Sequence, residues 1–215
     1  MLTEVKERSI LFSAPMVRAI LGGLKTQTRR VVKGSTEFKG PYNPEYMEAH
    51  KDSKGWASIC PYGSPGERLW VRETWSPSTG AVPLARVPNV DPRSEYPDIR
   101  VWYSCDNDRP TWAETNWHPS IHMPRWASRI CLEITGVRVE RLNEISHHDA
   151  LQEGLIEWSD PPRVTTLHYG LNRADVWETS APAAYKRLWS TIHAADGPNG
   201  WAANPWVWVV EFRKV

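Results

Sequence analysis

The stretch ILFSAPMVRAILGGLKTQTRR, residues 10–30, joins a short apolar run to a helical pattern and a basic segment. Residues 10–12 are apolar and predict a short strand. Ser13 is a residue type that caps helices, and Pro15 falls in the first helical turn, where its missing N–H costs nothing. Apolar residues then recur at helical spacing, at Met16, Val17, Ile20 and Leu21. The pair Gly22-Gly23 supplies a left-handed exit, so we expect a strand, a helix and a turn in this order.

The segment GLKTQTRR, residues 23–30, contains three cations and two hydroxyls in eight residues. It has two interpretations, a basic loop that grips a phosphate backbone or a reactive lysine and threonine. In an extended strand Lys25 and Thr28 would point to opposite faces, whereas in a turn or helical loop they would lie together. The glycine pair favours the turn.

Outside this stretch, the patterns predict a few strands and two further helices. We expect strands at about residues 69–73, 99–104, 126–142 and 205–212, with Gly136 as a bulge, and helices at about 146–153 and 181–192. Residues 33–60 and 76–119 have no sustained period and are interpreted as loop-rich insertions in a single domain, 1–215. Strands joined mostly without βαβ crossovers favour an α+β fold, a small mixed barrel with helices packed on it.

The composition limits the possible partners and compartment. The chain has 26 Lys and Arg against 25 Asp and Glu, so no global field draws it onto nucleic acid and any basic site must be local. Its three cysteines (Cys60, Cys105 and Cys131) suit neither a disulfide framework nor a metal knuckle, which favours a reducing cytoplasm. No segment approaches the roughly 20 apolar residues of a membrane span, and no signal peptide is evident. We therefore expect a cytoplasmic protein without membrane contact.

The histidines do not form a metal-binding pattern. His147 and His148 are adjacent and cannot share one helical face, and His118 and His122 lie around prolines that argue against a helix. We expect no metal and no cofactor.

The order of these pieces resembles a known family. The segments ILGGLKTQTRR, PGERLWVRE, ALQEGL and NPWVWVVEF resemble the ASCH family, in the versions found in larger phage and prophage members. The resemblance covers about residues 8–32, 62–75, 120–157 and 180–215. It implies a PUA-like mixed β-barrel with flanking short helices, in which the two loop-rich stretches are insertions.

The resemblance also implies an activity. Some small bacterial ASCH members are amidohydrolases that remove the acyl group from N(4)-acetylcytidine, with a reactive lysine and threonine in a G-x-K-T-x-T motif and a glutamate near A-x-x-E. On this sequence those residues are Lys25, Thr28 and Glu153. The chain is about twice as long as those enzymes, and its tryptophan-rich loops have no counterpart in them. Other members resemble RNA-binding domains or ribonucleases, so an RNA-binding module or a ribonuclease is the alternative.

The chemistry of amide hydrolysis fits these residue types. Thr28 would attack and Lys25 would take its proton, which requires a lysine whose pKa of roughly 10.4 is lowered by burial or nearby cations such as Arg29 and Arg30. Two roles are open for Glu153. It is either ionised and orients Lys25, or protonated and donates to the cytosine ring nitrogen.

Four further residues are candidates for substrate binding, Thr26, Arg29, Glu73 and Tyr103. For Arg29 and Arg30 the alternatives are a phosphate or base contact and a surface ion pair. For Glu73 the alternative is a pair with a cation on a neighbouring strand. Four tryptophans in the insertions are candidates for stacking on a base, Trp56, Trp102, Trp112 and Trp117.

Overall fold

The computed structural model describes eight segments of the chain, residues 5–33, 43–53, 55–77, 100–106, 117–159, 167–171, 178–194 and 197–215. Their helices and strands are β1 (Glu7–Leu11), α1 (Ala14–Leu21), β2 (Gln27–Val31), α2 (Pro44–His50), α3 (Trp56–Ile59), β3 (Arg68–Arg72), β4 (Trp75–Pro77), β5 (Val101–Tyr103), β6 (Cys131–Arg141), α4 (His147–Gln152), β7 (Ile156–Ser159), β8 (Leu167–Gly170), α5 (Ala181–Ile192) and β9 (Trp206–Lys214).

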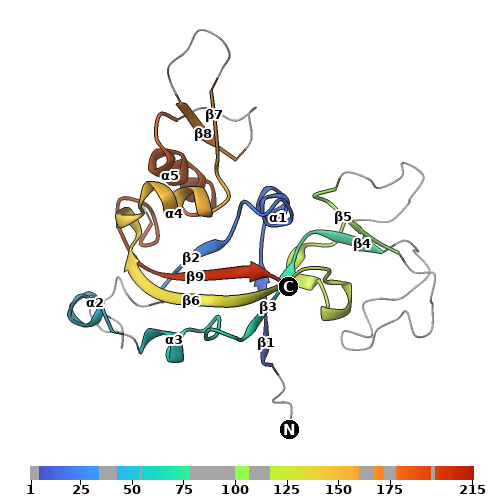
Figure 1. Cartoon of the computed structure of the whole chain (residues 1–215), viewed down its shortest axis with the longest axis horizontal. Helices are drawn as coiled ribbons and strands as arrows, with labels where there is room; N and C mark the ends of the chain where they lie inside the picture. The colour runs from blue at the N-terminus through green and yellow to red at the C-terminus, as the bar shows by residue number, and fades with distance from the viewer. Residues whose placement is uncertain are drawn as a thin grey trace.

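A mixed five-stranded sheet forms the centre of the molecule (Figure 1). Its strand order is β1-β3-β6-β9-β2, in which β1 and β3 are parallel and the other neighbours are antiparallel. Two small antiparallel pairs, β4–β5 and β7–β8, lie outside this sheet. The predicted α+β class is confirmed.

The described strands do not close into a barrel, because β1 and β2 end the strand order without backbone pairing to each other. A side chain nevertheless connects these edges. Arg30 in β2 donates from Nη2 to the carbonyl of Leu11 in β1, over 2.6 Å. In a flat sheet the two strands would be four steps of about 4.8 Å apart, roughly 19 Å. The sheet therefore curves until one arginine spans the opening.

Strand β9 separates two hydrophobic cores. Trp206, Trp208, Val210 and Phe212 pack in the core with β1, β3 and α1, and Val207 and Val209 pack in the core of α4 and α5. Because successive residues of a strand face opposite sides, a strand buried on both sides has an almost continuous apolar sequence. This places α4 and α5 on the face of β9 and β2 opposite the larger core.

The region around α1 agrees with most of the predictions. Pro15 lies in the first turn, and a register shift between Ile134 and Gly136 confirms the bulge in β6. Ser13 occupies the cap position, but its side chain makes no capping hydrogen bond. Of the pair Gly22-Gly23, only Gly23 has left-handed backbone, at φ 73°, whereas Gly22 continues the helical conformation.

The structure differs from the predictions in the insertions and at strand ends. Residues 33–60 are not only loop, because α2 and α3 form there. These short helices bury Met47 and Trp56 against the sheet, and a helix that depends on such a tertiary contact has no clear pattern in its own sequence. The strand predicted at 126–142 begins only at Cys131, since residues 125–127 form a 3₁₀ turn. The hairpin β7–β8 was not predicted. Most of 76–119, including Trp112, lies outside the described residues.

Candidate active site

Lys25 and Glu153, 128 positions apart in the chain, form a buried ion pair. Lys25 follows the turn after α1, where Gly23 lets the backbone leave the helix, and Glu153 is the residue that ends α4. The two residues also form an antiparallel backbone bridge. The Lys25 Nζ donates to Glu153 Oε2 over 2.6 Å and to the Glu153 carbonyl over 3.0 Å. The resemblance placed these two residues in one site, and the fold brings them into contact.

The surroundings of Lys25 disfavour its charge. Its side chain is 0% exposed, and burial lowers its pKa below the ordinary lysine value. The Glu153 carboxylate opposes this shift, and the positive charges of Arg30 and Arg29 add to it. Nζ also donates a third hydrogen bond, to the Gln27 carbonyl over 2.8 Å. This carbonyl belongs to the peptide unit that joins Gln27 to Thr28. The lysine amine therefore lies beside the backbone of Thr28.

Both oxygens of the Glu153 carboxylate accept hydrogen bonds from cations. Lys25 binds Oε2, and the Nη1 of Arg29 donates to Oε1 over 3.0 Å. This is the arrangement of an ionised carboxylate. Of the two roles left open for Glu153, the geometry favours the ionised group that orients Lys25.

Arg29 is buried among carboxylates. Its Nε and Nη2 donate to Glu140 Oε1 over 2.8 and 2.5 Å, and Nη2 lies 3.5 Å from Asp149 Oδ2. Arg138 also bonds Glu140 and Asp149 from the outer side. We call these residues the ion-pair network: Lys25, Arg29, Arg138, Glu140, Asp149 and Glu153. The network holds Arg29 against Glu153, so Arg29 can position that carboxylate. Arg29 also lines a cavity beside the network, and its direct contact with substrate stays a prediction.

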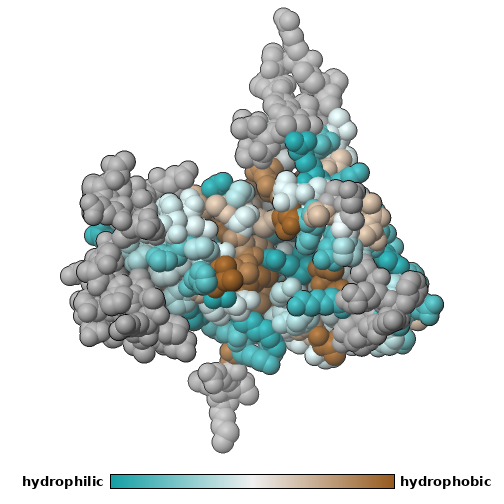
Figure 2. Space-filling model, turned by 180° about the vertical axis from the view of Figure 1, so that it is seen from behind, coloured by the Kyte–Doolittle hydropathy of each residue, from teal (hydrophilic) through white to brown (hydrophobic). Residues whose placement is uncertain are grey.

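A cavity of about 580 Å³ opens beside the network, between β2, α1 and α5. Thr28 and Glu153 line it, whereas Lys25 does not. Thr28 is 4% exposed, and no hydrogen bond of its hydroxyl is found among the described residues. The aromatic and imidazole rings on the wall are Phe12, Tyr62, Tyr185, Trp189 and His193. Figure 2, the view from behind, shows apolar patches gathered near the middle of that face with hydrophilic residues around them.

Comparison with protein-family models, with curated proteins and with solved structures finds no match. Function is therefore inferred from the side chains and their surroundings.

Arg30 differs from its neighbour Arg29. It lines the cavity, and among the described residues no carboxylate lies within 4.0 Å of its guanidinium. Its Nη2 is bound to the Leu11 carbonyl and its guanidinium carbon lies 5.3 Å from the centroid of the Phe12 ring. Both arginines line the cavity, but Arg29 is held by ion pairs, whereas Arg30 has no carboxylate partner among the described residues.

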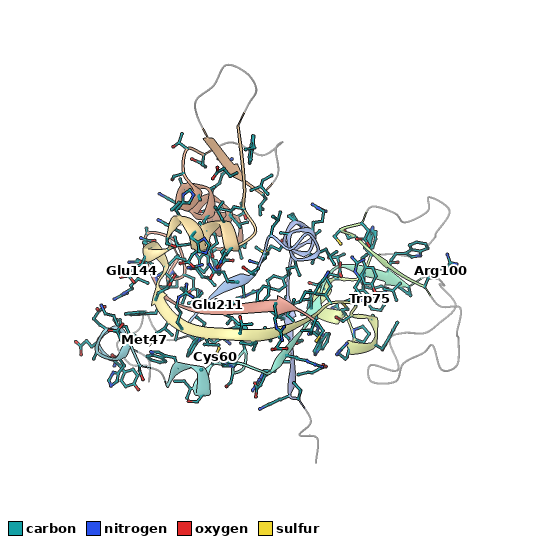
Figure 3. All side chains as sticks on the ribbon, viewed as in Figure 1. Met47, Cys60, Trp75, Arg100, Glu144 and Glu211 are labelled. Carbon is teal, nitrogen blue, oxygen red and sulfur yellow. The ribbon has the colours of Figure 1, made fainter. Side chains whose placement is uncertain are left out.

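The other predicted substrate contacts lie elsewhere. Glu73 is buried and bound by Arg129 at 3.1 and 3.2 Å, so it does pair with a cation, although Arg129 lies just before β6 and not on a strand. The hydroxyl of Tyr103 donates to the Ala127 carbonyl, and the Arg129 guanidinium lies over its ring at 3.8 Å. Neither residue lines the cavity, although Thr74 does. Figure 3 shows this side of the molecule by the labelled Trp75, well apart from Glu144 near α4.

Thr26 also faces away from the cavity. Its backbone N–H donates to the Gln152 carbonyl over 2.9 Å, and its carbonyl accepts from the Phe212 N–H over 2.8 Å. Thr26 instead lines a separate hollow together with His148 and Leu151. Thr26 therefore holds the Lys25 turn between α4 and β9 instead of touching the cavity.

Sequence reasoning missed Glu140, Asp149 and Tyr185 as members of the site. Glu140 lies on the long strand β6 and looks like any surface acid of a strand. Asp149 has the spacing of a helix cap, and its N–H does bond Ser146 Oγ at 3.0 Å. Tyr185 lies on the apolar face of α5, and that face lines the cavity. The register of β6 against β9 brings Glu140 to Arg29, and the packing of α4 and α5 brings Asp149 and Tyr185 to it.

Metal ligation is not indicated by the described residues, which contain no group of three or more His, Cys, Asp or Glu placed to hold an ion. Cys60, Cys105 and Cys131 are free thiols. Within the same segments, no helix has the length and apolar character that crossing a membrane requires.

Gly154 allows the Lys25 turn to pack against α1. Its φ is 97°, and an added Cβ would lie 2.8 Å from Ala19 Cβ and 3.1 Å from Lys25 Cβ. We expect Gly154→Ala to lower the free energy of unfolding by about 2–4 kcal/mol, from backbone strain and overpacking. Gly66→Ala is the control, since Gly66 also has positive φ but open space around it, so it should lose less. Equal losses in urea unfolding would contradict the packing argument.

Proposed function

We propose that this protein is an amidohydrolase that removes the acyl group from N(4)-acylated cytosine nucleosides such as N(4)-acetylcytidine. We further propose that its curved sheet, which does not close among the described strands, belongs to the PUA-like fold of the ASCH family. The observation that carries the proposal is the buried contact of Lys25 with Glu153 beside a cavity that Thr28 lines. Two short motifs far apart in the chain thus supply one cluster with a nucleophile, a base and a carboxylate.

In the proposed reaction the Thr28 hydroxyl attacks the acyl carbon. Its Oγ forms a bond to that carbon while the neutral amine of Lys25 takes its proton. The bond from the acyl carbon to N4 then breaks, and N4 takes up the proton that Lys25 accepted, so that it leaves as the amino group of cytidine and Lys25 becomes neutral again. Water hydrolyses the resulting threonine ester, which releases the carboxylic acid and restores Thr28.

The ion-pair network prepares Lys25 for this step. Nζ donates hydrogen bonds to three acceptors at 2.6 to 3.0 Å, which is the pattern of a protonated lysine. Loss of one proton gives up one of these three bonds and leaves a lone pair, which the amine must turn toward Thr28 about its Cε–Nζ bond in order to accept the proton. Burial favours that neutral form, and Glu153, fixed by Arg29, keeps the amine in place.

The cavity suits a planar base with its attached sugar. Its volume of about 580 Å³ falls in the range of roughly 300–1,000 Å³ of small-molecule sites. Aromatic walls stack on a base without selecting its sequence context. A site of this kind takes one base and its sugar. This favours hydrolysis of a small molecule over binding of a long nucleic-acid strand.

The test is incubation of the protein with N(4)-acetylcytidine, with release of cytidine followed by chromatography. A labelled single-stranded RNA is offered in parallel. Cytidine release without RNA binding or cleavage is the expected result. RNA binding or cleavage without cytidine release would instead support the RNA-binding or ribonuclease alternative.

We expect the kcat/KM for N(4)-acetylcytidine to rise with pH as Lys25 loses its proton. Since burial lowers the Lys25 pKa, the rise should level off below the ordinary lysine value of 10.5. Between the two pKa values the unfolded chain binds more protons than the folded one, so the free energy of unfolding should also rise with pH there. The measurements are a pH–rate profile and urea unfolding over the same range. A rate that falls through this range would contradict Lys25 as the base.

A further inference from the structure

One cation in the cavity has no acidic partner. Every cation of the ion-pair network bonds at least one carboxylate, at 2.5 to 3.2 Å. Arg30 has none within 4.0 Å among the described residues. Burial, and then the charge of Arg30, lowers the pKa of His193 on the same wall, which favours its neutral form. The cavity therefore presents one positive charge, that of Arg30, which no carboxylate among the described residues compensates.

The Arg30 guanidinium is held in one orientation with donors unused. Its Nη2 is fixed by the Leu11 carbonyl at 2.6 Å, and its plane lies over Phe12. Its Nε is buried and has no hydrogen-bond partner among the described residues. A guanidinium has five N–H donors, and only one of them, on Nη2, has an acceptor among these residues, so a ligand oxygen in the cavity would find donors available.

The chemistry of that ligand follows from the donor. A guanidinium matches the oxygens of a phosphate, with which it forms short charge-assisted bonds. The hydroxyls of Ser13, Thr74 and Ser120 line the same cavity and supply neutral donors. A cytosine nucleoside is uncharged and would leave Arg30 desolvated without an opposite charge.

We propose that the site takes a nucleotide, an N(4)-acylated cytidine that carries a phosphate, and that Arg30 binds the phosphate. The identity of the base rests on the proposed function, whereas the phosphate rests on Arg30 alone. The enzyme would then act on phosphorylated cytidines in preference to the free nucleoside.

The first test measures binding and needs no turnover. Calorimetry compares cytidine 5′-monophosphate with cytidine on the full chain, at low salt. We expect the nucleotide to bind about 10- to 100-fold more tightly, the effect of one charge-assisted contact. In Arg30→Gln that ratio should fall close to one, and Arg30→Lys should keep part of it. Arg213→Gln, which removes an exposed arginine paired with Glu133, should leave the ratio unchanged.

The outcomes separate the two proposals. Equal affinities for both ligands in the wild type, no binding of the nucleotide, or an unchanged ratio in Arg30→Gln would overturn the phosphate site. Hydrolysis is then compared for N(4)-acetylcytidine and its 5′-monophosphate. Equal kcat/KM values would keep the amidohydrolase and reject the phosphate preference. Tight Arg30-dependent binding with no hydrolysis of either compound would keep the phosphate site and reject the amidohydrolase.

Discussion

Lys25→Met is expected to lower the kcat for N(4)-acetylcytidine by about 10³-fold or more, because the proton of the Thr28 hydroxyl then has no acceptor. Methionine keeps most of the volume of the lysine stem and removes only the amine. The measurement is cytidine release under saturating substrate. Lys33→Met is the matched control, since Lys33 is an exposed lysine a few residues along the same segment, and its activity should equal that of the wild type.

The same substitution tests the structural role of the pair. Removal of one partner from a buried ion pair costs about 3–5 kcal/mol, and Glu153 retains Arg29 at 3.0 Å, so we expect the lower end. Urea unfolding must therefore accompany the rate measurement. A folded Lys25→Met protein that hydrolyses N(4)-acetylcytidine at the wild-type rate would exclude Lys25 as the base.

Thr28→Ala is expected to lower kcat by a similar factor, about 10³-fold or more, with little change in stability. The hydroxyl makes no hydrogen bond with the described residues, so its loss costs little, and loss of the buried methyl group should lower the free energy of unfolding by about 1 kcal/mol. This combination distinguishes a nucleophile from a structural threonine.

Thr28→Ser is the matched variant, because serine keeps the attacking oxygen. It should retain a measurable share of the wild-type kcat, and acylation of residue 28 should be detectable by mass spectrometry after rapid quenching. A Thr28→Ala protein with unchanged turnover, or a Thr28→Ser protein as inactive as the alanine variant, would contradict attack by this hydroxyl.

The elements with strong local patterns were predictable. Residues 14–21 have apolar side chains at helical spacing with proline in the first turn, and α1 forms there. The apolar run at the end of the chain is β9, and the alternation with Gly136 is β6 with its bulge. The short helices α2 and α3 were not predictable, because their stability comes from burying Met47 and Trp56 under the sheet.

The candidate site was predictable in part. The motif resemblance pairs Lys25 with Glu153, but it does not say whether the carboxylate is ionised, and it does not separate Arg29 from Arg30. Lys25 and Thr28 do not share one turn, because Thr28 already belongs to β2 while Lys25 precedes that strand. Local spacing could not decide this, since either conformation suits the residues between them.

The amino-acid sequence by itself determined the α+β class, the main strands and helices, and a basic segment rich in hydroxyls after α1, because these depend on side-chain periodicity and on glycine and proline over short distances. Only the tertiary structure decided what each charge does. Arg29 and Arg30 are neighbours with the same chemistry, but successive residues of a strand face opposite sides. Both arginines line the cavity, but Arg29 meets Glu140, Asp149 and Glu153, whereas Arg30 meets Phe12 and no carboxylate among the described residues. One arginine is therefore neutralised and the other remains available.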